Sequence, residues 1–234
     1  DAESPSTEDF SIQITGTTSP PGDPPLIIGP NFQIDYTIFD DDPPPKISFA
    51  SFATNLQINE AAGTIDVGVV RDGTAVGVVT CDVEIRAAGT TARSSASGLD
   101  PQDFGTGFIG TQLSFPAGPP STQFVTVPII NDNVDETLET LQLRLSNIVG
   151  AGASSVASLL QTIEIIDDDI PVATFASASQ SGFESIGAPS LLVTLDPISS
   201  RDIAVDFTMS PGTATFNQDY AGSQVGTVLF PAFS

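Results

Sequence analysis

The sequence contains no histidine and no tryptophan, a single cysteine (Cys81), and only six basic residues among 234. Without histidine, the acyl-transfer arrangements that use an imidazole base are not available. A lone cysteine excludes a disulfide framework within the chain. Nucleic acids and anionic membranes call for patches of lysine and arginine, and no apolar run reaches the roughly 18 residues of a membrane-spanning helix. We therefore expect a protein that is not an enzyme, binds no nucleic acid and does not insert directly into a membrane.

Acidic residues, by contrast, are abundant. The 29 aspartates and glutamates outweigh the basic residues and give a net charge of −23 at pH 7. Such a surface attracts cations, and it destabilises the compact state by self-repulsion when no cation is bound. The composition therefore indicates a divalent metal as a partner.

An acidic phrase occurs twice, as DYTIFDDD at Asp35–Asp42 and as TIEIIDDD at Thr162–Asp169. The two aspartate triplets begin at Asp40 and Asp167, 127 residues apart, and similar phrases (KISFAS and VATFAS) follow them. A period of this length is a whole domain, because solenoid units have about 20–50 residues. We predict the last two strands of one domain at 1–42, a complete domain at 43–169, and the first part of a further domain, without its last strands, at 170–234.

Alternating apolar and polar residues predict β-strands throughout the chain, for example at Ile65, Val67 and Val69. In the complete domain we expect strands near 46–51, 55–59, 64–71, 78–86, 111–115, 123–130, 139–147 and 161–166. Cys81 shares the apolar face of its strand, which predicts a buried structural thiol. Many short strands with glycine- and proline-rich turns, and no apolar stripe at helical spacing, favour an all-β sandwich.

Carboxylates gather where the predicted strands of the complete domain meet loops. Strand ends cluster at the two poles of a sandwich, so loops distant in sequence can converge there. Hard cations such as Ca²⁺ take 6–8 oxygen ligands, largely from Asp and Glu, whereas two carboxylates about 4 Å apart repel by roughly 4 kcal/mol at an effective dielectric of 20. The alternative is a solvated acidic edge that binds nothing. The candidate ligands are Glu60, Asp103, Asp132, Glu136, Glu139, Asp167, Asp168 and Asp169.

The candidate ligands recur in the two partial units, which favours a site over a solvated edge. In the third unit, Glu184 and Asp219 repeat Glu60 and Asp103. In the first unit, Asp1, Glu8 and Asp40–Asp42 repeat Asp132, Glu139 and Asp167–Asp169.

Four phrases resemble a known family: INEAAGTIDVGVVRDG from Ile58, IINDNVDETLETLQLRLSN from Ile129, IIDDD from Ile165 and GTATFNQDYAG from Gly212. In their order and spacing the chain is similar to the Calx-β domain, found in sodium–calcium exchanger regulatory loops, integrin β4, sponge aggregation factors and bacterial surface proteins. With the partial copies, the resemblance covers nearly the whole chain. It implies a tandem array of seven-stranded, immunoglobulin-like antiparallel β-sandwiches. It also implies Ca²⁺ at the pole facing the next domain, held by the eight candidates above.

The sequence departs from the family pattern at three places. Asn131 stands where calcium-loaded relatives often have aspartate, which puts one ion in doubt. An insertion, ARSSASGLDPQ, precedes Asp103 and leaves Asp100 as a rival ligand. Pro5 stands at the position of Glu136, so the copy of the site in the first unit is one carboxylate short.

We expect a calcium-binding structural or adhesive repeat module, extracellular or at the cell surface, because extracellular modules bind Ca²⁺ at about 10⁻⁴–10⁻³ M. The alternative is a calcium-sensor module that regulates an attached membrane transporter or receptor. The expected partners are neighbouring Calx-β domains. They include a head-to-tail oligomer or filament, in which residues 1–42 of one chain complete residues 170–234 of the next by strand addition. Against that assembly stands a plain slice of a longer polypeptide.

Overall fold

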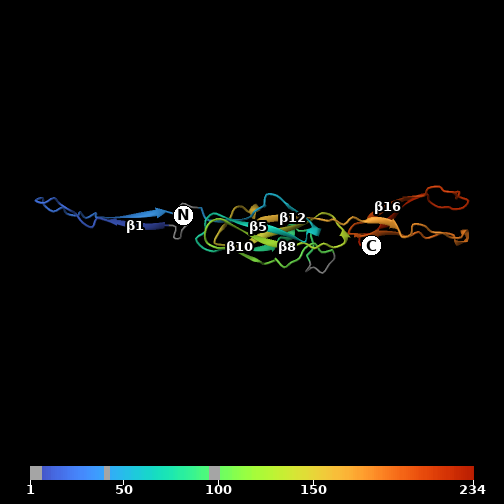
Figure 1. Ribbon diagram of the computed structural model, residues 1–234, viewed down its shortest axis with the longest axis horizontal. Helices are drawn as coiled ribbons and strands as arrows, with labels where there is room; N and C mark the ends of the chain where they lie inside the picture. Colours follow the sequence, from blue (N-terminus) through green and yellow to red (C-terminus); the bar gives the residue numbers. More distant parts are fainter. Residues whose placement is uncertain (1–6, 40–42, 95–100) are drawn as a thin grey trace.

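The computed structural model describes residues 7–39, 43–94 and 101–234, and nearly all of its regular structure is β-strand. A hairpin lies beyond one end of a central sandwich, and a third unit lies beyond the other end (Figure 1). The predicted fold class, a tandem array built on an all-β sandwich, is confirmed.

Two sheets form the central sandwich. One has the strand order β4-β12-β10-β6-β7 and the other the order β11-β3-β5-β8. The strands of the first sheet are β4 (Leu56–Asn59), β6 (Val79–Ile85), β7 (Gln112–Phe115), β10 (Glu139–Val149) and β12 (Leu160–Ile166). Those of the second are β3 (Lys46–Phe49), β5 (Thr64–Asp72), β8 (Ser121–Pro128) and β11 (Gly152–Ala153). Short 3-10 segments lie between strands, among them η1 (Glu60–Ala62), η2 (Ala87–Gly89) and η4 (Ala157–Leu159).

The period-2 alternation seen in the sequence is the alternation of buried and exposed side chains in the sheets. On β5, Val67 and Val69 point into the core while Asp66 faces solvent and accepts a hydrogen bond from Thr126 at 2.6 Å. β5 pairs antiparallel with β8, with Val67 opposite Val125. The inner faces of both sheets, including Phe49, Phe115, Leu143 and Ile163, make one apolar core.

A parallel strand pair positions the acidic pole. β4 runs parallel to β12, with Ile58 opposite Ile165 and Asn59 opposite Ile166. Parallel neighbours end at the same edge of a sheet. The residues that follow them, Glu60 and Asp167, therefore leave the sheet side by side.

The N-terminal hairpin consists of β1 (Thr7–Gln13) and β2 (Gln33–Phe39), paired antiparallel. Phe10 lies opposite Tyr36, with ring centroids 5.4 Å apart. Every residue of both strands is exposed, including the apolar ones. The repeated acidic residues Asp1 and Asp40–Asp42, and Pro5, lie outside the described residues.

The third unit contains β13 (Val172–Phe175), β14 (Val193–Asp196), β15 (Ile198–Ser199), β16 (Ile203–Thr208), β17 (Val225–Phe230) and the 3-10 segment η5 (Glu184–Ile186). β13 pairs with β14, and β16 pairs with β17. β15 pairs instead with β9 (Val134–Asp135), a short strand of the central domain. Because that pair crosses the joint, the third unit contacts the central domain at Val134–Asp135, directly before Glu136.

Candidate metal centre

Six of the eight predicted ligands come together as two trios at the pole that faces the third unit. We call Glu60, Asp167 and Asp169 the linker trio, and Asp103, Glu136 and Glu139 the loop trio. In each trio, one ligand atom per residue lies within 4.8 Å of the others. Two oxygens on opposite sides of one Ca²⁺ are about 4.8 Å apart, twice the usual ligand distance of about 2.4 Å. Both trios therefore have the span of an ion-binding site.

Local capping places Glu60. The side chain of Asn59 accepts a hydrogen bond from the backbone N–H of Ala61 at 2.9 Å, which starts the single turn η1. Gly63 ends the turn in the left-handed region (φ 75°), where its missing Cβ avoids strain. Glu60 is held at the strand end with 2% of its surface exposed.

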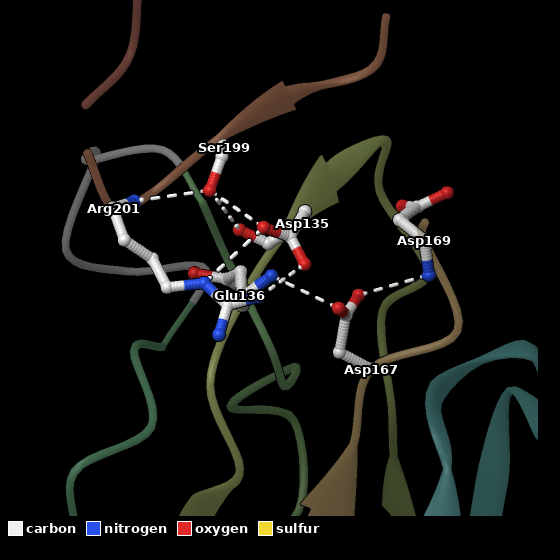
Figure 2. A network of polar contacts seen from close by, with 6 residues as sticks. All are labelled: Asp135, Glu136, Asp167, Asp169, Ser199 and Arg201. Carbon is white, nitrogen blue, oxygen red and sulfur yellow. Dashed lines mark hydrogen bonds and ion pairs between the residues drawn. The ribbon is translucent and has the colours of Figure 1, made fainter. Parts of the chain in front are cut away.

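Asp167 links the two trios and orders the segment that leads into the third unit. Its Oδ2 accepts a hydrogen bond from the backbone N–H of Glu136 at 2.9 Å, and its Oδ1 accepts one from Asp169 at 3.1 Å (Figure 2). One carboxylate thereby fixes backbone in both trios.

Backbone hydrogen bonds between loops hold the loop trio. Asp103 donates its N–H to the carbonyl of Arg93 at 2.9 Å, and its carboxylate accepts the N–H of Arg93. Its carbonyl accepts the N–H of Ile130 at 3.0 Å. Glu139 is the first residue of β10 and lies opposite Ile165 of β12. Asp103 is consequently 2% exposed although it sits in a loop.

Asp132 interacts electrostatically with both trios: burial is the main cause of the raised pKa of Glu60, Glu136 and Glu139, and the charge of Asp132 adds to it in each case. Its carboxylate accepts hydrogen bonds from the backbone N–H of Gln102 at 3.2 Å and of Val134 at 3.0 Å.

Asp168 belongs to neither trio. It is exposed, and its charge adds to burial and to the charge of Asp167 in raising the pKa of Asp169. The rival ligand Asp100 lies outside the described residues.

Burial and mutual repulsion raise the pKa of the site's glutamates. Burial, followed by the charge of Asp167, raises the pKa of Glu60 to about 7. Burial, followed by the proximity of Asp103, raises the pKa of Glu136 to about 9 and of Glu139 to about 8. A divalent cation would remove both causes, because it supplies opposite charge and replaces the lost hydration.

Three carboxylate oxygens at this pole are buried without a hydrogen-bond partner among the described residues: Oε1 of Glu60, Oε2 of Glu139 and Oδ2 of Asp169. An unpartnered buried anionic oxygen is costly unless a cation meets it. The donors are all carboxylate oxygens, with no nitrogen or sulfur, which is the ligand set of Ca²⁺, Mg²⁺ and Mn²⁺. The residues present therefore fit a hard divalent cation.

Comparison with known protein families decides the identity of the fold. The model of the Calx-beta domain family matches residues 40–169 and again residues 167–232. The chain belongs to the Calx-beta domain family. Searched against curated proteins, the sequence has no match.

Solved Calx structures resemble this Calx-beta chain. The apo-form Calx CBD1 domain is 25% identical over 54% of this chain and 100% of that one, with a TM-score of 0.43. The CBD12 structure from CALX1.2 is 26% identical over 81% of this chain and 72% of that one, with a TM-score of 0.42.

Among the described residues, no helix is long and apolar enough to cross a membrane.

The partial Calx-beta units do not reproduce the trios within the part of the chain that the structure describes. In the third unit, Glu184 is exposed, and the carboxylate of Asp219 accepts the N–H of Thr215 at 2.7 Å. In the first unit, Glu8 lies exposed on β1.

Sequence reasoning missed one group at the pole of this Calx-beta domain: Asp135, Ser199 and Arg201 (Figure 2). Asp135 stands within the acidic run DNVDETLE, between the candidate ligands Asp132 and Glu136, and the sequence gives it no distinct role. The available signal was Arg201, the only basic residue at positions 170–234.

Proposed function

We propose that this chain is a calcium-binding repeat module of a structural or adhesive array, in which Ca²⁺ held by the central domain stiffens the joint to the next domain. The observation that carries the proposal is the set of three buried carboxylate oxygens that have no partner among the residues the structure describes, gathered at the pole that faces the third unit. Together with Asp132, the two trios would supply the protein ligands for the ions.

The mechanism is local. The linker trio includes Asp167 and Asp169, and only Ile170 and Pro171 separate Asp169 from β13 of the third unit. An ion bound there would fix the direction in which the chain leaves the central domain. It would also neutralise repulsion between carboxylates that burial has brought together.

We also propose an extracellular or cell-surface location, which the same chemistry supports. Extracellular modules work with Ca²⁺ affinities of about 10⁻⁴–10⁻³ M, which suit a fluid rich in that ion. The net charge of −23 supports this setting, because it keeps repeated domains apart except where cations bind.

The test is a calcium titration of the whole chain by calorimetry and by melting temperature, with Mg²⁺ as the comparison ion. We expect binding with a Kd of about 10⁻⁴–10⁻³ M and a rise in melting temperature. Glu60→Gln and Glu136→Gln should each weaken binding. Glu84→Gln, which removes the same charge from a residue paired with Arg144 elsewhere on the sheet, should not. An unchanged melting temperature at saturating Ca²⁺ would contradict the proposal.

A calcium-sensor module that regulates an attached membrane transporter or receptor is the second candidate. It is favoured by the density of charge, since two adjacent trios of carboxylates make a strongly anionic site. The affinity for Ca²⁺ increases with the number of charged ligands. A Kd of about 10⁻⁷–10⁻⁵ M in the same titration would select the sensor.

Strand addition between copies is the proposed mode of assembly. The hairpin β1–β2 is exposed on both faces. The third unit has counterparts of the first strands of the central domain, but among the described residues none of β10 or β12. Residues 1–42 of one copy would fill those places in the next, giving a filament or ring. The native mass of the chain tests this assembly. If the chain is a monomer at all concentrations, the exposed faces of the hairpin and of the third unit would instead pack against neighbouring domains of a longer polypeptide.

A further inference from the structure

A second contact crosses the joint and uses none of the candidate ligands. We propose that Asp135, Ser199 and Arg201 form a metal-independent tie, which orients the third unit on the central domain before any ion binds. This goes beyond the proposed function, because it assigns part of the joint's order to contacts that Ca²⁺ does not make.

The tie is a buried carboxylate with partners on both oxygens. Asp135 is 4% exposed and Ser199 is 2% exposed. The Ser199 hydroxyl donates to Oδ2 of Asp135 at 2.5 Å. The Arg201 guanidinium donates from Nη2 to Oδ1 at 2.6 Å and from Nε to Oδ2 at 3.3 Å (Figure 2). This two-pronged geometry fixes direction as well as distance.

The backbone reinforces the tie. β15 pairs in parallel with β9, with Ser199 opposite Asp135. Ser200 donates its N–H to the carbonyl of Asp135 at 2.8 Å. Further along the chain, Phe233 donates its N–H to the carbonyl of Ser199 at 2.8 Å, which connects the end of the third unit to the same point. A short strand pair and a side-chain clamp therefore hold one place together.

Charge distribution distinguishes Asp135 from the ligands beside it. In the described parts of the chain the trios keep buried oxygens without partners, whereas both oxygens of Asp135 accept hydrogen bonds from a hydroxyl and a guanidinium. Arg201 is the only basic residue at positions 170–234, in a chain with six in all. Asp135 thus already has its counter-charge, supplied by the neighbouring unit.

The tie and the ion site are adjacent but separable. Asp135 contacts the third unit, and the next residue, Glu136, belongs to the loop trio. Without Arg201, Asp135 would be a buried carboxylate lacking its cation, and the pairing of β9 with β15 would lose its anchor. None of the tie's contacts uses a carboxylate of the trios, so we expect the tie to persist when chelation removes the ion.

The experiment measures the spread of distances across the joint in excess EDTA. Spin labels on Thr122→Cys in β8 and Thr208→Cys in β16 report it by pulsed electron resonance, since both positions are exposed and Cys81 is buried. We expect a narrow distribution for the labelled chain and one about twofold or more broader for Arg201→Gln, because domains without a firm interface move freely. The matched control is Arg144→Gln, which loses the same charge and its pairing with Glu84, far from the joint; it should stay narrow.

If the distance distribution of the labelled chain in EDTA is as broad as that of Arg201→Gln, the tie is overturned, whatever effect Ca²⁺ then has. The other informative outcome is a distance distribution that is narrow in EDTA and broad in Arg201→Gln, in a chain that binds no Ca²⁺. In that case the tie stands and the proposed function fails. Hydrogen exchange of β16 and β17 shows whether the glutamine variant keeps the third unit folded. If it does not, Arg201→Lys replaces it: the charge remains without the fork, so broadening supports the tie and an unchanged width overturns it.

Discussion

The carboxylate of Asp167 accepts the backbone N–H of Glu136 at 2.9 Å, so a ligand of the linker trio is bonded directly to the backbone of a ligand of the loop trio. The two candidate ion sites are therefore mechanically connected. Whatever orders Asp167 also positions Glu136, and linkage requires the converse effect to be equal. Calcium binding at the two trios is expected to be cooperative for this reason.

Asp167→Asn should weaken binding at both trios, whereas Glu60→Gln should weaken mainly the linker trio. The amide can no longer accept hydrogen bonds at both positions, and it carries no charge for the ion. We expect a loss of about tenfold or more in affinity for Asp167→Asn. Calorimetry reads both affinities. Asp168→Asn is the control, since Asp168 is exposed and outside the trios; an equal loss there would contradict this geometry.

Stability of the calcium-free protein should fall as pH rises. Below pH 4.5 the glutamates are protonated in both folded and unfolded chains and exert no penalty. The folded pKa values of Glu60, Glu139 and Glu136 are raised from 4.5 to about 7, 8 and 9. Between pH 4.5 and about 9 the folded state therefore binds more protons than the unfolded state, and its stability decreases.

Melting curves in EDTA at pH 5 and pH 8 check this prediction. We expect the higher melting temperature at pH 5. Added Ca²⁺ should reverse the order, because the cation binds the deprotonated carboxylates and gains most at pH 8. A calcium-free protein that is more stable at pH 8 would show that these carboxylates do not dominate the pH dependence.

Glu136→Gln should have opposite effects with and without calcium. In EDTA at pH 10, above the pKa of about 9 that Glu136 has in the folded chain, it removes one charge from a cluster of repelling carboxylates and should stabilise the fold by about 1 kcal/mol after solvent screening. In Ca²⁺ it removes a ligand and should lower the melting temperature. Urea unfolding under the two conditions measures both signs. Glu84 lies outside the ion site, so Glu84→Gln should change the stability by the same amount in EDTA and in Ca²⁺.

Cys81 should be unreactive in the folded chain and serve as a reporter of opening. Its side chain is fully buried, and burial raises the pKa of the thiol to about 11. Thiol-disulfide reagents attack the thiolate, which is scarce and covered at pH 8. We expect modification only after unfolding in urea, and more slowly with Ca²⁺ if the ion stabilises the domain. Rapid labelling of the native protein would contradict the packing of β6.

The strands were predictable wherever alternation persisted. The segment predicted at 64–71 is β5, Thr64–Asp72, because a long half-buried strand shows its period locally. β9 (Val134–Asp135) and β15 (Ile198–Ser199) are two residues each and carry no period to read. They exist because they meet across the joint.

The convergence of the ligands could be anticipated, but not their division of labour. The sequence placed Glu60 and Asp167 where strands meet loops, and the family resemblance implied a shared pole; the parallel pairing of β4 with β12 that brings them to one edge is seen only in the structure. The segment DNVDETLE does not show which of its acidic residues would bind a metal ion and which one pairs with an arginine side chain. The partner of Asp135 is 66 residues away in sequence, so only the folded joint reveals it.

Asp167–Asp169 are both metal-ligand candidates and the covalent route from one unit to the next, with two residues remaining before β13. A force that stretches a series of such units would act on this short segment. It would strain the ion coordination and the Arg201–Asp135 pair before it reached the hydrophobic core. Each joint would then yield first and re-form when the load is released. Extensibility of the string would be set by carboxylate chemistry and dissolved calcium, while the sandwiches themselves stay intact.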